Sequence, residues 1–234
     1  MTGKDHQTVR RVRVWDLPIR VFHWALVLLI FGSWLTGAVL DSYLDWHMYI
    51  GVTIGGLVLF RLMWGLWGSD TARFTQFIRG PGGILDYLRG RGAIEGLRLG
   101  HNPLGALSVV ALLGLLCVQV GTGLFAHDDA FTEGPFHEFV SSDTSDWLTA
   151  IHKQNFYVLF AFILLHVGAV FFHVLVKHQD LLRAMITGWM RIPSNLRLHR
   201  DSVRLRFGGW LVFVVTAAIA AAVAWWVAAQ IVTL

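Results

Sequence analysis

The sequence predicts an all-α integral membrane protein that crosses the bilayer five times. Its 234 residues are 55% hydrophobic and only 15% charged, whereas a soluble domain usually carries about 25% charged residues. Five apolar stretches reach the length of about 20 residues that a membrane-spanning helix needs. No stretch shows the extended polar–apolar alternation of a membrane β-strand. The composition therefore excludes a disordered chain and an ordinary soluble globule. Nucleic-acid binding is not expected, because the basic residues flank the apolar spans.

The predicted spans are, in chain order, Leu17–Leu40, Trp46–Trp67, Leu104–Ala126, Leu148–Val176 and Trp210–Val232. The first is far longer than a signal-peptide core, so we expect the mature protein to keep its N-terminus. The second begins at a tryptophan, a residue enriched at membrane interfaces. The third follows Asn102 and Pro103, a pair typical of helix starts. The fourth is the longest. The fifth is rich in alanine and has no ionisable residue, which favours close helix packing or partner contact.

Two further segments connect the spans. Gly68–Gly100 is too long for a simple connection, and its apolar residues predict short amphipathic pieces at the membrane interface. These residues are Phe74, Phe77, Ile78, Ile84, Leu85, Tyr87 and Leu88. Gly80-Pro81-Gly82-Gly83 separates the pieces. Arg191–Phe207 is expected to be a cytoplasmic linker to the last helix.

The charges outside the spans predict the orientation. The N-terminal tail and the second and fourth loops hold the basic residues Lys4, Arg10, Arg11, Arg13, Arg20, Arg73, Arg79, Arg89, Arg91, Arg98, Lys177, Arg183, Arg191, Arg197, Arg200, Arg204 and Arg206. The first and third loops have no lysine or arginine, and hold Asp41, Asp45, Asp128, Asp129, Glu133, Glu138, Asp143 and Asp146. Because cytoplasmic loops carry the positive excess, we expect the N-terminus on the cytoplasmic side of the membrane and the C-terminus on the outer side.

Histidines inside the spans are the strongest functional signal, since ionisable groups at membrane depth are rare. His152 and His166 are 14 residues apart, which on a helix is about 40° short of four turns and about 21 Å of rise. Both side chains therefore face the same way, one near each leaflet. His47 matches the depth of His152, and His23, about 25 Å from the outer surface, matches the depth of His166. His173, at about 38 Å, is too deep for either pair.

Two pairs of imidazoles at two depths predict two bis-histidine haems, because haem iron is commonly held by axial histidine. Two protein ligands leave no open coordination position, which favours electron transfer. The alternative is that these histidines have only a structural role, in packing or in hydrogen bonding. Zinc or copper is less favoured, since each pair supplies two ligands and no thiolate is near.

Other polar residues near the inner leaflet have two interpretations each. Arg61 and Arg20 either pair with a haem propionate or extend to the cytoplasmic interface. Asn102 either caps its helix or, with His101, hydrogen-bonds a quinone head group. His101 or His173 would deliver protons there, unless they are simply interfacial. The acidic outer loop, with His127 and His137, would bind a metal or, more simply, remain solvated and attract a basic partner.

Several motifs resemble a known family. They are Val14-Trp15-Asp16-Leu17-Pro18-Ile19-Arg20-Val21-Phe22-His23-Trp24, Trp46-His47-Met48-Tyr49-Ile50-Gly51, Phe60-Arg61-Leu62-Met63-Trp64-Gly65, Gly100-His101-Asn102-Pro103-Leu104-Gly105 and the histidine spacing of Leu148–His166. The sequence is similar, over residues 12–190, to the bacterial cytochrome b-561 and nickel–iron hydrogenase b-type cytochrome family, and to the cytochrome b subunits of membrane formate dehydrogenases.

The resemblance implies a four-helix bundle that binds two haems b, with a fifth C-terminal transmembrane helix outside the common core. It assigns His47 and His152 to the outer haem and His23 and His166 to the inner haem, and it places a quinone-site asparagine at Asn102. The implied domains are a di-haem bundle over 1–190, followed by a linker and an additional helix over 191–234.

The leading functional hypothesis is an electron-transfer subunit that links a periplasmic redox partner to the membrane quinone pool. The partner would be a hydrogenase, another dehydrogenase or a cytochrome c. One alternative is a free-standing superoxide:quinone oxidoreductase of the b-561 type, which would need a cationic outer surface to attract superoxide. A second alternative is a proton or metal transporter that uses the histidines without haem.

Overall fold

Five long helices dominate the computed structural model, which describes residues 9–40, 43–78, 80–89, 99–128, 132–194 and 205–231. They are α1 (Leu17–Ala38), α2 (Leu44–Trp67), α5 (Pro103–Gly123), α6 (Ser142–Leu175) and α9 (Trp210–Ile231). All five are long and apolar enough to cross a membrane, so the chain is a multi-pass membrane protein. The five predicted spans are confirmed, and α6 begins six residues before the predicted start at Leu148.

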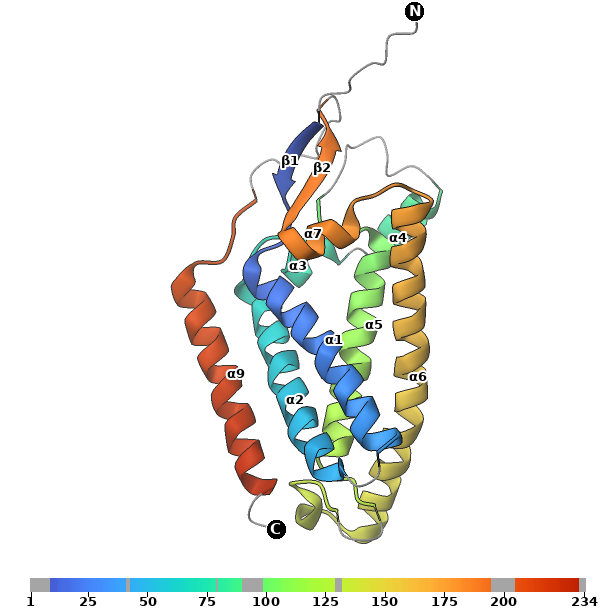
Figure 1. The fold of residues 1–234 in the computed structure, drawn as a ribbon, viewed down its shortest axis with the longest axis vertical. Helices are drawn as coiled ribbons and strands as arrows, with labels where there is room; N and C mark the ends of the chain where they lie inside the picture. Colours follow the sequence, from blue (N-terminus) through green and yellow to red (C-terminus); the bar gives the residue numbers. More distant parts are fainter. Residues whose placement is uncertain are drawn as a thin grey trace, which may run out of the picture.

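The helices form a bundle of four with one helix outside it (Figure 1). α1 packs on α2, α2 on α5, and α5 on α6, while α9 packs on α2 from the outside. A side chain on Gly56 of α2 would place its Cβ 2.8 Å from the Cβ of Ala224 on α9, and Trp67 donates a 2.9 Å hydrogen bond to Thr216 Oγ1. The small residues therefore let α9 approach closely, as its composition predicted.

A buried carboxylate fastens the end of the bundle where α1 begins, which carries the ribbon and is called the inner end below; the opposite end is called the outer end. Asp16 caps α1 by accepting a 2.9 Å hydrogen bond from the Ile19 backbone N–H. Its other oxygen accepts hydrogen bonds from Trp64 Nε1, at 3.0 Å, and from Ser69 Oγ. Ser69 Oγ in turn accepts the Gly208 N–H, at 2.8 Å. One side chain thus ties the start of α1 to the end of α2 and to the segment that leads into α9.

Shorter elements cover that inner end. α3 (Phe74–Phe77) and α4 (Pro81–Leu88) are the short pieces expected between the second and third spans. α7 (Leu181–Thr187) lies across the end of the bundle, below a ribbon of two antiparallel strands, β1 (Val9–Arg13) and β2 (Trp189–Pro193) (Figure 1).

The ribbon was not expected from the sequence. The predicted linker Arg191–Phe207 is wrong over its first three residues, which belong to β2, and its stretch 195–204 lies outside the described residues. The strands pair because Val12 and Met190 pack against the core on one face, and Ile192 is buried with them. The predicted domain boundary at residue 190 falls inside β2 and stays a prediction.

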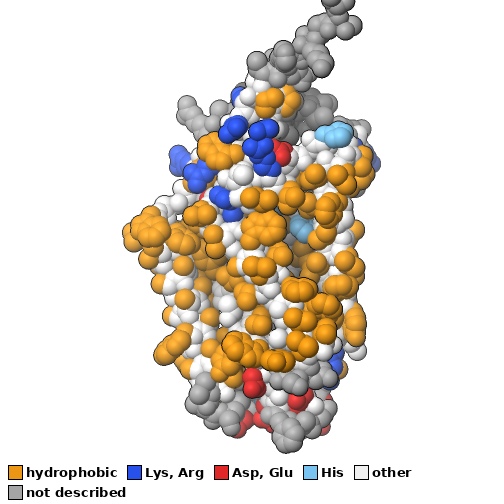
Figure 2. Space-filling view, viewed as in Figure 1, with side chains coloured by type: hydrophobic (Ala, Val, Ile, Leu, Met, Phe, Trp, Pro, Cys, Tyr) orange, Lys and Arg blue, Asp and Glu red, His pale blue; other side chains and the backbone are white. Residues whose placement is uncertain are grey.

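The surface is divided by charge along the bundle (Figure 2). Hydrophobic side chains cover its middle, with Leu28 71% and Leu165 68% exposed, as suits a face in contact with lipid. Arginines gather near the ribbon, and carboxylates gather at the opposite end. The expected charges that lie outside the described residues are Lys4, Asp41, Arg79, Arg91, Arg98, Asp129, Arg197, Arg200 and Arg204.

Candidate functional site

The outer pair of predicted histidines meets at the end of the bundle opposite the ribbon. His47 lies in the first turn of α2 and His152 in α6. Their ring centroids are 6.1 Å apart and their planes are inclined by 82°. The structure therefore brings together two imidazoles that are 105 positions apart in the chain (152 minus 47).

Each outer imidazole is oriented by a main-chain carbonyl. His47 Nδ1 donates to Ser33 O on α1, at 2.8 Å, and His152 Nδ1 donates to Gln119 O on α5, at 2.9 Å. A proton fixed on Nδ1 leaves Nε2 as the nitrogen with a free lone pair, which is how metal-bound histidines are usually held. His47 is thus preset as an Nε2 ligand, whereas the Nε2 lone pair of His152 accepts a hydrogen bond from the Gln119 amide, at 3.1 Å, which a bound iron would have to replace.

Two glycines make room for these rings. A Cβ on Gly37 of α1 would collide with the His47 ring, and a Cβ on Gly123 of α5 would lie 2.8 Å from His152 Cε1. Any larger residue at either position would push the ring away from its carbonyl acceptor. The glycines therefore belong to the outer site as spacers.

A polar chain beside His152 was missed by the sequence analysis. Asn155 Nδ2 donates to Leu115 O, at 3.0 Å, and to Gln119 Oε1, at 2.7 Å. The Gln119 amide then lies with its Nε2 3.1 Å from His152 Nε2 and donates to His152 O, also at 3.1 Å. The signal that could have found this chain is the presence of two amide side chains inside otherwise apolar spans. Buried polar groups need hydrogen-bond partners, so each of these amides should have one in a neighbouring helix.

The inner pair consists of His23 on α1 and His166 on α6. The two side chains are close enough to interact electrostatically. His23 packs edge-on against Trp24, with ring centroids 5.1 Å apart. Its Nδ1 is buried and has no hydrogen-bond partner in the described part of the chain. This pair is therefore less tightly fixed than the outer one.

Arg61 on α2 is buried within electrostatic reach of His101, with only 3% of its surface exposed. Its guanidinium lies over Phe74 and Phe77, 5.0 and 5.9 Å from the ring centroids. Its Nη1 has no hydrogen-bond partner among the described residues. The interpretation of Arg61 as a side chain that extends to the cytoplasmic interface is therefore wrong. A buried cation with an unused donor fits an anionic group such as a carboxylate.

His101 lies between two aromatic rings, 4.8 Å from Trp15 and 4.7 Å from Phe77 between centroids. Burial lowers the pKa of His101 to about 3, and the nearby Arg61 cation and His166 add to the effect. A histidine with this pKa is neutral throughout the physiological range, so the expected proton delivery by His101 is not supported. A neutral His101 still exchanges hydrogen bonds.

Asn102 caps α5, because its Oδ1 accepts the Gly105 N–H at 2.7 Å. The capping interpretation is confirmed. The cap uses the side-chain oxygen alone, so the amide NH₂ of Asn102 keeps its donors for another group.

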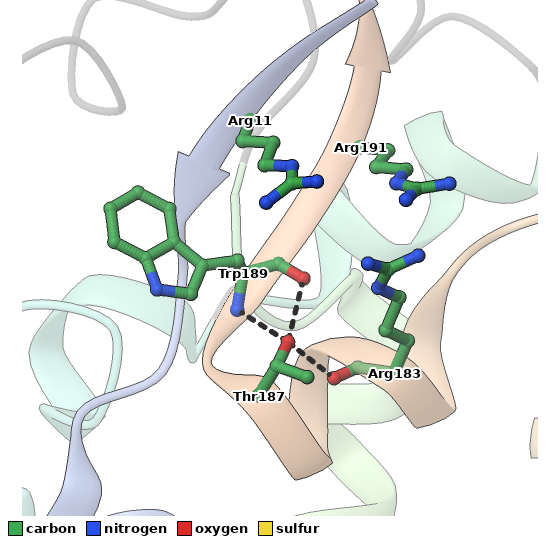
Figure 3. A pocket seen from close by; sticks show the side chains of 5 residues that line it. All are labelled: Arg11, Arg183, Thr187, Trp189 and Arg191. Atoms are coloured by element: carbon green, nitrogen blue, oxygen red, sulfur yellow. Dashed lines mark hydrogen bonds between the residues drawn. The ribbon is translucent and has the colours of Figure 1, made fainter.

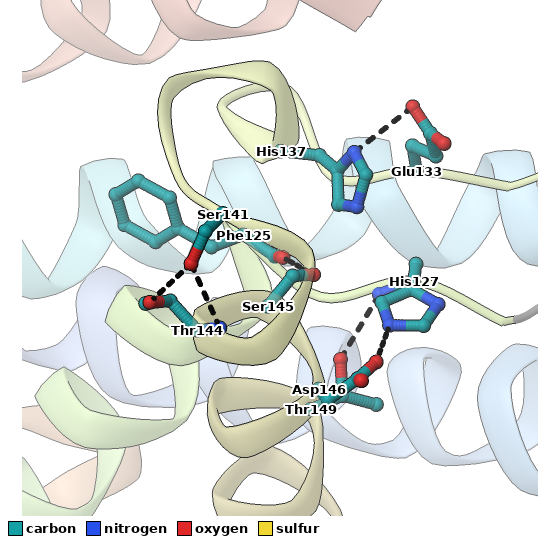
Figure 4. A network of polar contacts seen from close by, with 9 residues as sticks. All are labelled: Phe125, His127, Glu133, His137, Ser141, Thr144, Ser145, Asp146 and Thr149. Carbon is teal, nitrogen blue, oxygen red and sulfur yellow. Dashed lines mark hydrogen bonds and ion pairs between the residues drawn. The ribbon is translucent and has the colours of Figure 1, made fainter.

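The acidic outer loop holds two histidine–carboxylate pairs (Figure 4). His127 Nε2 lies 2.7 Å from Asp146 Oδ1, and His137 Nδ1 lies 3.1 Å from Glu133 Oε2. The described residues contain no group of three or more His, Cys, Asp or Glu that would hold a metal ion. This counts against the metal site and favours the solvated acidic loop.

The model of one protein family, described as prokaryotic cytochrome b561, matches residues 14–188. The chain belongs to the prokaryotic cytochrome b561 family. It is a membrane b-type cytochrome, and the family implies haem and electron transfer. No solved structure matches the chain significantly.

Two curated proteins are similar to this cytochrome along most of its length. One, from Azotobacter chroococcum mcd 1, is 24% identical over 234 aligned positions, and the other, from Azotobacter vinelandii, is 25% identical over 233. Each alignment covers 83% of the cytochrome and 95% of the relative. Both relatives are named probable Ni/Fe-hydrogenase B-type cytochrome subunits.

The residues of the outer pair fit haem iron. His47 and His152, with ring centroids 6.1 Å apart, would be the residues that hold the haem iron, because imidazole is a common haem ligand. Haem iron takes its other ligands from the porphyrin, so a site with two histidines and no third protein ligand suits it. At the inner end, the unpartnered Arg61 Nη1 and His23 Nδ1 are donors that a bound group with carboxylates would satisfy.

Proposed function

We propose that this cytochrome carries electrons between a redox partner in the periplasm and the membrane quinone pool, and that it uses two haems b. The observation that carries the proposal is the outer pair, in which His47 and His152 face each other at 6.1 Å with both Nδ1 atoms already occupied. His166 follows His152 on α6 after about four turns, where His23 is its neighbour.

In this proposal, His47 and His152 hold the outer haem, and His23 and His166 hold the inner one. Arg61 pairs with a propionate of the inner haem. Haem, when bound, takes up and releases single electrons at its iron. The carbonyls of Ser33 and Gln119 keep the outer ligands in one tautomer and make them better donors.

The quinone is proposed to bind at the inner end, next to Asn102 and His101. The amide NH₂ of Asn102 donates to a quinone oxygen, while its Oδ1 stays on the helix cap. His101 remains neutral and contributes a hydrogen bond only. Proton transfer is assigned to His173 on the same rim, whose Nδ1 has no partner among the described residues.

A hydrogenase is the proposed redox partner, because both curated relatives carry that name. The basic end, with the N-terminus, faces the cytoplasm, and the acidic end, with the C-terminus, faces the periplasm of a bacterial plasma membrane. An acidic end attracts a partner with a basic patch and repels superoxide, which disfavours the free-standing oxidoreductase.

The proposal is tested by counting haems per chain with the pyridine haemochrome assay. The purified wild-type protein should hold two, and His47→Ala or His152→Ala should hold one. His127→Ala is the matched control, since the His127 ring lies in the outer loop and pairs with Asp146 in the first turns of α6, and it should hold two. One haem per wild-type chain, or two in His152→Ala, would contradict the assignment.

A further inference from the structure

Three arginines from three elements surround a pocket of about 300 Å³ at the inner end. Arg11 comes from β1, Arg191 from β2 and Arg183 from α7, and Thr187 and Trp189 complete the lining. Figure 3 shows the three guanidinium groups gathered over one space, with no carboxylate among the residues drawn.

The pairing of the strands concentrates this charge. Arg11 and Arg191 are direct partners in the ribbon, so their side chains leave from the same face, and like charges directly opposite each other destabilise a strand pair. Within the described residues, none of the three arginines has a carboxylate partner. Arg73, by contrast, pairs with Asp70. A bound anion would remove the repulsion.

The backbone segments that carry the arginines are held in place by the fold. The chain turns from α7 into β2 at Gly188, whose φ is +85° and whose carbonyl accepts the Val14 N–H at 2.8 Å. Thr187 Oγ1 donates to Arg183 O, at 2.9 Å, and accepts the Trp189 N–H, at 3.2 Å. On the other face of the ribbon, Val12 and Met190 pack against the core and Ile192 is buried. The fold therefore fixes the backbone positions from which the three arginine side chains extend toward the pocket.

The surroundings identify the class of anion. Leu182, Ile186 and Trp189 are 43%, 52% and 47% exposed, so an apolar row runs along α7 beside the row of Arg183 and Thr187. α7 itself is tied to the inner end of α1 by the hydrogen bond from Trp24 Nε1 to Met185 O, at 3.3 Å. Arginines that bind phosphate, next to apolar side chains at the level of the bilayer surface, are the features that recognise an anionic lipid.

We propose that Arg11, Arg183 and Arg191 bind the phosphate of an anionic phospholipid in the leaflet at this end of the bundle. Arginine suits this task because its planar fork contacts two phosphate oxygens at once. The acyl chains of the lipid lie against Leu182, Ile186 and Trp189.

The test uses the full-length haem-loaded protein in detergent, with added phosphatidylglycerol or phosphatidylcholine, and follows lipid binding by native mass spectrometry and unfolding by haem absorbance. Phosphatidylglycerol should bind the wild type and raise its melting temperature, and phosphatidylcholine should do neither. The double variant Arg183→Gln/Arg191→Gln should bind phosphatidylglycerol at least tenfold more weakly. Arg89→Gln, an exposed arginine on α4's C-terminal side, removes a charge outside the pocket and should bind like the wild type.

Three results would overturn the proposal. The first is equal binding of phosphatidylglycerol by the wild type and the double variant, and the second is equal stabilisation of the wild type by the two lipids. The third is full stabilisation of the wild type by inorganic phosphate or glycerol phosphate at the same concentration, which would identify a soluble phosphate as the ligand. The last two tests need no variant. Without anionic lipid, Arg191→Gln should melt no lower than the wild type, because it removes a repulsion.

Discussion

The outer histidines are oriented by backbone carbonyls and not by other ionisable side chains. Ser33 O and Gln119 O belong to helices whose positions are fixed by packing, so the tautomer of each imidazole is set by the main chain. A carbonyl acceptor carries no net charge, and it therefore orients the ligand without adding a buried carboxylate at membrane depth.

Gly123→Ala should lose the outer haem, because the new Cβ would lie 2.8 Å from His152 Cε1 and displace the ring. Gly121→Ala on the same helix is the matched control, since a Cβ there meets nothing within 4 Å. Both changes favour the helix by up to about 1 kcal/mol, so weaker folding cannot explain a difference. The haemochrome assay should give about half the wild-type haem for Gly123→Ala only. Full haem in both variants would show that the close contact is not needed.

Asn102 has two roles, the capping of α5 through its side-chain oxygen and the proposed donation of a hydrogen bond to quinone through its amide NH₂. Two substitutions separate these roles. Asn102→Asp keeps the oxygen that caps α5 but replaces the amide donors, while Asn102→Leu removes both. Aspartate caps helices as well as asparagine does, so Asn102→Asp should melt like the wild type, whereas Asn102→Leu should lose about 1 kcal/mol. Both should slow quinone reduction by roughly tenfold, the loss of one hydrogen bond of about 1.4 kcal/mol. Normal rates in Asn102→Asp would remove the amide from the quinone site.

At the scale of elements, Asp16 joins more of the chain than any predicted site residue does. Its carboxylate accepts the capping N–H of α1, the Trp64 indole and the Ser69 hydroxyl, and it is only 3% exposed. The opening motif thus has a structural reason apart from haem, because it fixes where α1 meets the end of α2.

Asp16→Ala should destabilise the protein by about 2–4 kcal/mol, the sum of a lost helix cap and of donors left buried without partners. Thermal unfolding of the purified protein in detergent measures the loss. Asp180→Ala is the control, since Asp180 precedes α7 without forming a side-chain cap, and it should change stability little. Equal melting of the two variants would refute the role of Asp16 as a connector.

The long elements were predictable and the short ones were not. Spans, charge bias and histidine spacing depend on local sequence and on the bilayer, so the sequence alone places all five helices. The ribbon depends on the pairing of two segments that four membrane-spanning helices separate in the sequence, and five-residue strands have no distinctive local pattern. Gly37, Gln119 and Asn155 were missed for a related reason, because their roles depend on which neighbouring helix each one faces.

The molecule as a whole is an electrical dipole along the membrane normal. Arginines gather at the ribbon end and carboxylates at the other (Figure 2). The described part of the outer end includes Glu133, Glu138, Asp143 and Asp146. This surface should guide a partner with a basic patch during approach, and such guidance is screened by salt.

If the proposed hydrogenase is added as a separate protein, hydrogen-driven reduction of the proposed haems should therefore slow as ionic strength rises from about 10 to 150 mM, when the screening length falls from about 30 to 8 Å. Glu138→Gln/Asp143→Asn should slow it further and flatten its salt dependence. Asp180→Asn removes a negative charge at the opposite end and serves as the control. Stopped-flow haem absorbance measures all three, and identical salt profiles would exclude the acidic surface from docking.

The ribbon also has a consequence for the order of biogenesis. Arg11 and its partner Arg191 are 180 positions apart (191 minus 11), so β1 leaves the ribosome long before β2 exists. At roughly 5–20 residues per second, translation imposes a wait of about 10–40 s. During that interval the first four spans can insert while the inner end has neither its ribbon nor α7. Ribbon closure is thus a late event in the assembly of the bundle.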